Sequence, residues 1–381
     1  MRVLMLIDEM FAARERSMLR RLEVGLADEG VSVVHAVPEQ SVGDLDVSGA
    51  LADAVTFPMG GPFMTRTMRA RRLLSNVREL TDSGELPKID VIHAFGGEVW
   101  ELALQVGHEI EAPVVLDVWR RGLAGKARLL RAQLRTSSGV LFMAPDVSVE
   151  RALAAEAPGI PVRTALWGVH RAPAPRPIMQ EGRATSVFLA GNGREPAVFH
   201  AGFEGILLAL GSSRESIIFA DAEAAARSKL WSVAERLGVL DRLSLIADIE
   251  GKRELVVMGD AIVQPESHGE QRSLLLDAMG QGMVVATGYD PDVSWLLPGR
   301  TAAVLDRAAE PTSPDAWAAL LAPILSDPAR ARQLGESAWQ YVGANHRAST
   351  HVAAVLDAYE WVGSKEAIPY PASPERSARV R

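Results

Sequence analysis

Residues 260–283 read DAIVQPESHGEQRSLLLDAMGQGM, and this stretch holds one complete strand–loop–helix unit. The apolar residues 261–263 predict a short buried strand, which ends at Pro265 because proline cannot donate a hydrogen bond to a sheet. The run from Ser273 to Met279 predicts a helix that opens behind a polar loop. A strand followed by a loop and a helix is the repeating unit of parallel α/β sheets, so the stretch predicts a fold of that class.

The same unit recurs along the whole chain. In the first half, apolar runs predict strands at residues 1–7, 31–37, 89–94, 113–118 and 139–143, and helices at 15–29, 98–109 and 147–157. In the second half they predict strands at 186–190, 216–220, 242–246, 261–264 and 283–287, and helices at 199–210, 222–237 and 273–280. Alternating strands and helices with short connections imply two doubly wound parallel sheets.

A proline-rich segment separates the two halves. Residues 169–185 contain Pro173, Pro175 and Pro177 and little that can pack, so we predict a linker there. The predicted domains are then two Rossmann-like units at 1–168 and 186–345, and the second ends with amphipathic helices at 315–325 and 329–344. A last helix at 351–361 lies in a segment, 346–363, that we expect to cross back to the first domain. The proline-containing tail, 364–381, is predicted to be disordered.

The composition excludes several classes of protein. Of the 381 residues, 48% are hydrophobic, which is enough for two cores, and no apolar run is long enough to predict a membrane span. The start, MRVLMLIDEM, reads as a first strand and not as a signal peptide. The absence of cysteine excludes disulfides and thiol nucleophiles and fits a cytoplasmic protein. A net charge of −8 argues against nucleic acid as a partner.

Several motifs resemble those of the retaining glycosyltransferases of family 4. The family signature P-x-x-x-E-G-x-G-x-x-x-x-E-A is similar to residues 265–278, where Pro265 and Ala278 keep the frame while Gly269 and Asp277 replace its two glutamates. Further matches, in the order found in the family, are DVIHAFG from Asp90, WGVH from Trp167 and DPARARQLG from Asp327. The resemblance implies a GT-B fold, in which two Rossmann-like domains face a cleft. It also implies a nucleotide-sugar donor on the second domain and an acceptor on the first.

The resemblance implies that the diphosphate of this donor is bound without a metal ion or other cofactor. Backbone N–H groups at a helix start and one or two cations can neutralise a departing diphosphate. We therefore expect the loop at Gly269 and the amides around Ser273 and Leu274 to cradle an anion. Arg272 is placed to clamp a diphosphate, or it is a surface arginine or one paired with Glu270.

The second cation of the family has no direct counterpart. Its arginine and lysine follow the first strand of the second domain, but here Asn192 stands where the arginine is expected. Arg194, two residues further on, is the candidate for this catalytic charge, with a solvated loop arginine as the alternative. The resemblance assigns Asp277 to the donor ribose, unless it caps the helix or faces solvent. Gly269 cannot replace the family's first glutamate, so Glu270 is the candidate catalytic carboxylate, with Glu266 as the other choice.

The first domain departs from the family in a similar way. The family's Gly-Gly-x-Glu loop is represented by Ala12 and Ala13, with Glu15 retained. Trp119 stands where the family has a histidine near the transferred sugar, and it either stacks on a sugar face or packs at the end of a strand. His93 is expected to be a buried structural residue.

A basic amphipathic segment extends from Phe63 to Leu80. Five arginines alternate there with apolar side chains, and no acidic residue occurs before Glu79. Such a pattern is typical of a helix that contacts anionic lipid headgroups, and also of a solvated helix with an ordinary apolar stripe. The first alternative places the protein at the inner face of a membrane, in peripheral contact with it.

Two hypotheses of function follow. The first is a metal-independent, retaining glycosyltransferase, of the hexosyltransferase type used in polysaccharide biosynthesis. It would move a sugar from a nucleotide-diphosphate donor to a hydroxyl of a glycan or lipid-linked acceptor. The second is a GT-B-shaped scaffold or partner protein without transferase activity, which the replacements at Asn192, Gly269 and Trp119 favour.

Overall fold

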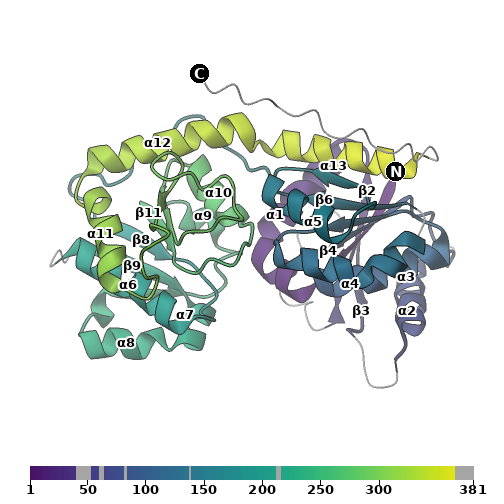
Figure 1. The fold of residues 1–381 in the computed structure, drawn as a ribbon, viewed down its shortest axis with the longest axis horizontal. Helices are drawn as coiled ribbons and strands as arrows, with labels where there is room; N and C mark the ends of the chain where they lie inside the picture. The colour runs from purple at the N-terminus through teal and green to yellow at the C-terminus, as the bar shows by residue number, and fades with distance from the viewer. Residues whose placement is uncertain (40–52, 60–63, 81–83, 137–138, 212–215, 365–381) are drawn as a thin grey trace.

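The computed structural model describes residues 1–39, 53–59, 64–80, 84–136, 139–211 and 216–364 (Figure 1). Two parallel sheets form two lobes that lie side by side. The first sheet has seven strands in the order β3-β2-β1-β4-β5-β6-β7. Their bounds are β1 (Arg2–Ile7), β2 (Ser32–Pro38), β3 (Asp53–Phe57), β4 (Val91–Phe95), β5 (Val114–Asp117), β6 (Val140–Ala144) and β7 (Val162–Thr164).

The second sheet repeats this topology with six strands, in the order β10-β9-β8-β11-β12-β13. Their bounds are β8 (Thr185–Leu189), β9 (Ser216–Asp221), β10 (Leu243–Ile246), β11 (Ala261–Gln264), β12 (Val284–Thr287) and β13 (Ala303–Val304). In both sheets the strand order changes direction between the first strand and the fourth, so that β1 lies beside β4 and β8 beside β11. In open α/β sheets, ligands bind outside the carboxyl ends of the strands at such a point.

Helices cover both faces of each sheet. Those of the first lobe are α1 (Glu9–Asp28), α2 (Arg66–Arg78), α3 (Trp100–Ile110), α4 (Gly122–Thr136) and α5 (Val147–Glu156). Those that follow are α6 (Pro196–Leu210), α7 (Ala222–Ser228), α8 (Leu230–Leu237), α9 (Arg253–Val256), α10 (Ser273–Gly280), α11 (Pro314–Leu325), α12 (Pro328–Asn345) and α13 (Ala348–Gly363). Among the helices that the structure describes, none combines the length and the apolar character that a bilayer crossing requires.

The strands predicted at the centre of each sheet are present within one or two residues, because buried parallel strands are continuous apolar runs. The edge strands β3, β7 and β13 and helix α4 were missed; β7 and β13 are very short. The predicted helix at 222–237 is two helices, α7 and α8, since Lys229 between them adopts a left-handed conformation with φ 59°.

Helix α1 begins at Glu9 and not, as predicted, at residue 15. Asp8 caps it, because its carboxylate accepts a hydrogen bond of 2.8 Å from the amide of Phe11. The helix is kinked at Glu15, whose φ of −131° and ψ of 27° are not helical. The early start places an additional helical segment, residues 9–14, directly after β1.

Two segments join the lobes. The chain at 169–185 is less loose than expected, because Ile178 is fully buried and the amide of Met179 donates to Asp260 at 2.6 Å. At the other end of the chain, α12 and α13 run in line along one side of both lobes (Figure 1). Helix α13 packs on the first sheet, where the hydroxyl of Tyr359 and Nδ1 of His93 are 2.7 Å apart. His93 is fully buried, and burial lowers its pKa to about 3, which fits the structural role expected for it.

Candidate functional site

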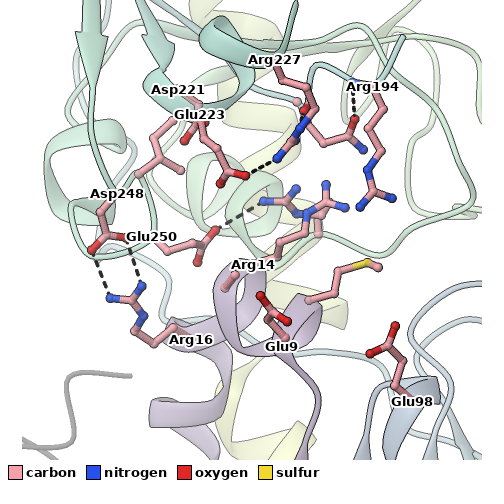
Figure 2. A pocket seen from close by; sticks show the side chains of 16 residues that line it. Glu9, Arg14, Arg16, Glu98, Arg194, Asp221, Glu223, Arg227, Asp248 and Glu250 are labelled. Atoms are coloured by element: carbon pink, nitrogen blue, oxygen red, sulfur yellow. Dashed lines mark hydrogen bonds and ion pairs between the residues drawn. The ribbon is translucent and has the colours of Figure 1, made fainter. Parts of the chain in front are cut away.

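A cavity of about 710 Å³ lies between the two lobes. Its volume is within the range of ~300–1,000 Å³ that small-molecule sites occupy. One wall consists of residues that follow β1 and β4, and the other of residues that follow β8, β9, β10 and β11 (Figure 2). The charged side chains that line it are Glu9, Arg14, Arg16, Glu98, Arg194, Asp221, Glu223, Arg227, Asp248, Glu250 and Arg272.

The wall from the first lobe is built on the additional segment of α1. Arg14 forms an ion pair with Glu270 of the second lobe, and its guanidinium lies over the ring of Trp119. Burial, together with the positive charge of Arg272, lowers the pKa of Arg14 to about 10. Two guanidinium groups therefore lie close together at this wall, and carboxylates of the protein are paired with both of them.

The loop after β8 forms the opposite wall. Its backbone is held by the buried carboxylate of Glu266, which accepts hydrogen bonds from the amides of Asn192 (2.6 Å), Gly193 (3.0 Å) and Glu195 (2.9 Å). The loop also passes so close to Glu266 that a Cβ at Gly191 would be 2.5 Å from the carboxylate. The carboxylate thus fixes the position from which Arg194 extends.

Arg194 is an exposed cation of this wall. Within the described ranges its guanidinium makes no hydrogen bond or ion pair. Nearby, Arg227 pairs with Glu223 and donates to the carbonyl of Asn192. Figure 2 shows Arg194 and Arg227 extending from the second lobe toward the side on which Arg14 lies.

The amino end of α10 is occupied by a carboxylate from the first lobe. Glu15 is fully buried and accepts hydrogen bonds from the amide of Ser273 at 3.2 Å and from the Ser273 hydroxyl. Nε of Arg272 donates to it at 3.1 Å, and Nη2 of Arg253 lies 3.5 Å from it. Of the donors expected to cradle a diphosphate, Arg272 and Ser273 are therefore bound to Glu15.

A network of charged side chains continues from this contact. Arg253 pairs with Glu250 at 2.6 Å and with Asp277 at 2.6 Å, and Asp277 also accepts from Arg21 at 3.0 and 3.1 Å. Arg272 lies 3.3 Å from Glu250. Burial raises the pKa of Glu250 to about 7, although the neighbouring arginines oppose this shift. The network links α1, α9 and α10 across the two lobes.

Backbone hydrogen bonds also join the lobes. The amide of Gln271 donates to the carbonyl of Trp119 at 3.0 Å, and the amide of Arg121 donates to the carbonyl of Gly269 at 3.3 Å. The residues between them, Arg120 and Glu270, form an antiparallel bridge. The loop after β11 and the chain after β5 are thus paired as two short strands, which we call the interlobe ladder (residues 119–121 and 269–271).

The predicted site residues fall into two groups. Gly269, Glu270, Arg272, Ser273 and Asp277 are together, but their polar groups are bonded to other residues of both lobes and do not form an open cradle. The amide of Gly269 donates to Asp290 at 2.8 Å, and Glu270 is paired with Arg14 and Arg120. Arg194 is on the opposite wall, and the side chain of Leu274 is fully buried, so that only its backbone can take part in binding.

These contacts decide the role of Trp119 and exclude two of the alternatives for Asp277. Trp119 is a packing residue, because it is 1% exposed and meets Phe11 edge to face. Asp277 neither caps the helix nor faces solvent, since it is paired with two arginines. Three arginines of the site, Arg14, Arg227 and Arg253, were not predicted from the sequence. The only local signal for Arg14 was that it begins a run of three charged residues, Arg14, Glu15 and Arg16, in the segment after β1.

Another buried carboxylate, that of Asp8, caps the start of α1. Burial raises the pKa of Asp8 to about 6, although the amides of Phe11 and Glu98 donate to it. A Cβ at Gly96 would be 2.0 Å from this carboxylate, so only glycine leaves room for it.

Among the described side chains, no three from His, Asp or Glu converge as the ligands of a metal ion would.

The chain matches no protein-family model and no curated protein. Solved structures do resemble it. A sucrose-phosphate synthase from Thermosynechococcus elongatus has a TM-score of 0.71 at 14% identity, over 94% of this chain and 98% of that one. HepE from Anabaena, solved with UDP and glucose, has a TM-score of 0.68 at 12% identity, over 94% and 99%.

A putative UDP-N-acetylglucosamine 2-epimerase from Listeria monocytogenes also shares the fold, with a TM-score of 0.61 at 12% identity, over 94% of this chain and 95% of that one. Likenesses at these identities establish architecture, since one fold can host several chemistries. Together with the two parallel sheets, they confirm the predicted GT-B fold, with two Rossmann-like lobes that face a cleft.

Proposed function

We propose that the protein is a glycosyltransferase that binds a nucleotide-diphosphate sugar between its two lobes. It transfers the sugar, with retention and without a metal ion, to a hydroxyl of a glycan or lipid-linked acceptor. The observation that carries this proposal is the charged cavity at the carboxyl ends of both sheets, whose lining includes five arginines and six carboxylates. HepE, which shares the fold, was solved with UDP and with UDP-glucose.

The charges of the cavity suit such a donor. Arg194, whose guanidinium is unpaired among the described residues, and Arg14, which lies beside Arg272, supply positive charge for a diphosphate. These charges stabilise the negative charge that grows on the leaving group as the sugar–oxygen bond breaks, which is the role a metal ion has in other transferases. The acceptor oxygen bonds to the anomeric carbon, and its proton passes to the departing diphosphate. No side chain has to act as a nucleophile.

The proposed roles of Asp277 at the ribose and Glu270 at the sugar require their present ion pairs to open. Asp277 is held by Arg21 and Arg253, and Glu270 by Arg14 and Arg120. Replacing Asp277 by alanine is therefore a poor test of nucleotide binding, since it leaves two arginines without their partner and destabilises the contact between the lobes.

Titration calorimetry with UDP, GDP, ADP and TDP tests the proposal. We expect saturable binding of one nucleotide, and at least a tenfold loss of affinity in Arg194→Ala, because a hydrogen bond to a charged group contributes about 1.5–3 kcal/mol. The matched control is Arg236→Ala on α8, an exposed arginine outside the cavity, which should bind as the wild type does. If folded wild-type protein binds none of the four nucleotides, the proposed function is wrong.

A GT-B scaffold without transferase activity is the second candidate, and the interlobe ladder favours it. The ladder and the Glu15 contact fill the region where the loop after β11 would have to meet a sugar. A scaffold would bind no nucleotide, or it would bind a nucleotide but leave the corresponding nucleotide sugar intact. Release of free nucleotide from that donor, measured with and without added acceptor hydroxyls, distinguishes the two candidates.

We also propose that α2 makes peripheral contact with an anionic membrane. Its apolar stripe, Ala70, Leu73, Leu74 and Val77, is buried. Arg71 and Arg72 are exposed beside Met68, which is 54% exposed. Arg66 and Arg69 are engaged, the former with Glu101 and the latter with the carbonyl of Pro58. Phe63, the first residue of the predicted segment, lies outside the described residues.

Sedimentation with vesicles that contain phosphatidylserine tests this contact at low salt. We expect the wild type to sediment with the vesicles, and the double variant Arg71→Ser, Arg72→Ser to lose most of this binding, because each basic residue near the surface contributes about 1 kcal/mol. The matched control is the double variant Arg330→Ser, Arg332→Ser on α12. It removes the same charge from another exposed surface and should sediment as the wild type does. Failure of the wild type to sediment would exclude the contact.

A further inference from the structure

The amino end of α10 has a ligand that belongs to the chain itself. The carboxylate of Glu15 accepts from the Ser273 amide at 3.2 Å, from the Ser273 hydroxyl and from Nε of Arg272 at 3.1 Å. Backbone amides at a helix start, a hydroxyl and a guanidinium are also the donors that a phosphate oxygen takes. Arg272 contacts Glu15 and lines the cavity as well, so this subsite is continuous with the proposed donor site.

The reach of Glu15 depends on the irregular course of α1. The helix starts early because of the Asp8 cap, and at Glu15 its backbone leaves the helical conformation. Glu15 is fully buried, and a carboxylate in such a place is stable only when it is paired and hydrogen-bonded. The carboxylate is thus bound to the second lobe as an anion would be.

We propose that Glu15 is an intramolecular anionic ligand that occupies the diphosphate subsite and holds the two lobes closed. This inference rests on the proposed function, since the competing ligand is the diphosphate of a donor. A donor binds fully only when Glu15 leaves the amino end of α10 and the lobes separate. The protein without donor is therefore closed, and binding of a diphosphate opens the Glu15 contact.

The charges of the network distinguish a competing ligand from a purely structural carboxylate. The network joins five arginines, at positions 14, 21, 120, 253 and 272, with four carboxylates, Glu15, Glu250, Glu270 and Asp277. Removing the charge of Glu15 leaves an excess positive charge at the amino end of α10. A purely structural carboxylate would only destabilise the fold when lost, whereas loss of a competing ligand increases the affinity for an external anion.

The first measurement is calorimetric titration of Glu15→Gln with inorganic pyrophosphate. Glutamine keeps the shape and one acceptor oxygen, so the contact loses its charge with the least change in packing. We expect the variant to bind pyrophosphate at least tenfold more tightly than the wild type. Glu29→Gln, an exposed substitution at the end of the same helix, is the matched control and should leave the affinity unchanged.

The second measurement reports closure directly and does not depend on nucleotide binding. The chain has no cysteine, so Ser75→Cys on α2 and Ser232→Cys on α8 can be spin-labelled specifically. Both serines are exposed, and they lie on different lobes (Figure 1). Double electron–electron resonance should give one narrow distance in the wild type. A longer or broader distribution is expected in Glu15→Gln, and also in the wild type saturated with pyrophosphate.

The outcomes separate this proposal from the function on which it rests. If the Glu15→Gln variant is open but binds no nucleotide, the closing role of Glu15 is supported and the proposed transferase function is wrong. Identical distance distributions in the wild type, in Glu15→Gln and with pyrophosphate would overturn the closing role, whatever the nucleotides do. If Glu15→Gln does not fold, the effect of pyrophosphate on the labelled wild type decides the question by itself.

Discussion

Replacing Arg253 by methionine should lower the free energy of unfolding by about 3–5 kcal/mol, which is the cost of leaving buried partner charges unpaired. Arg253 is 7% exposed and contacts the carboxylates of Glu250, Asp277 and Glu15. Burial alone would lower the pKa of Arg253. The three carboxylates have the opposite and larger effect, so the pKa of Arg253 lies above its usual value. Urea unfolding of the variant and the wild type measures the loss.

The pH dependence of this loss provides a check on its cause. Without Arg253 the buried carboxylates can take up protons, and in the wild type the pKa of Glu250 is already raised to about 7. Protonation removes the unpaired charges, so the deficit should be smaller at pH 5 than at pH 8. Arg16→Met breaks the partly exposed pair with Asp248 and should cost less than about 1 kcal/mol. A similar, small loss in both variants would show that the network does not stabilise the closed lobes.

Replacing Glu266 by glutamine should disrupt the loop that carries Arg194. One carboxylate oxygen accepts from the amides of Asn192 and Gly193, and the other from that of Glu195. In glutamine one of these oxygens becomes an NH₂ group, which faces a backbone donor and cannot accept from it. We expect a loss of about 2–3 kcal/mol in stability, since hydrogen bonds to a charged group are lost and a buried donor is left unsatisfied.

The same substitution should weaken nucleotide binding at least tenfold, because Arg194 loses its fixed position. Glu235→Gln, at an exposed site on α8, is the control for the change of charge. Thermal unfolding and calorimetric titration of both variants measure the two effects. Wild-type stability in Glu266→Gln would mean that the loop after β8 is ordered by other contacts.

Local features of the sequence were sufficient for the architecture. The bounds of α10 were predicted as 273–280 and are Ser273–Gly280, because a polar loop ends there and Gly280 closes an apolar run. Buried strands such as β11 are apolar on both faces, which makes them visible without any knowledge of their neighbours. The start of α1 was missed although Asp8 and Glu9 are typical residues for a helix cap and first turn.

The contacts of the site could not be predicted in the same way. Glu15 and Ser273 are separated by 258 residues, and their hydrogen bonds depend on how one lobe docks on the other. The sequence indicated that both residues are present at places where the family has a carboxylate and an anion site. It contained no periodic pattern that would reveal that the two bind each other. The pairing of Asp277 with Arg21 of the first lobe was missed for the same reason.

The interlobe ladder has a kinetic consequence. The amide protons of Arg121 and Gln271 are bonded to carbonyls of the opposite lobe, so both bonds break whenever the lobes separate. Their exchange with solvent deuterium then reports the frequency of opening, while amides inside β1 or β11 report unfolding of a lobe. If exchange of substrate and product requires the open form, turnover cannot be faster than this breathing motion. In the proposed transferase, the lifetime of the closed form would then limit turnover, and the chemical step would not set the rate.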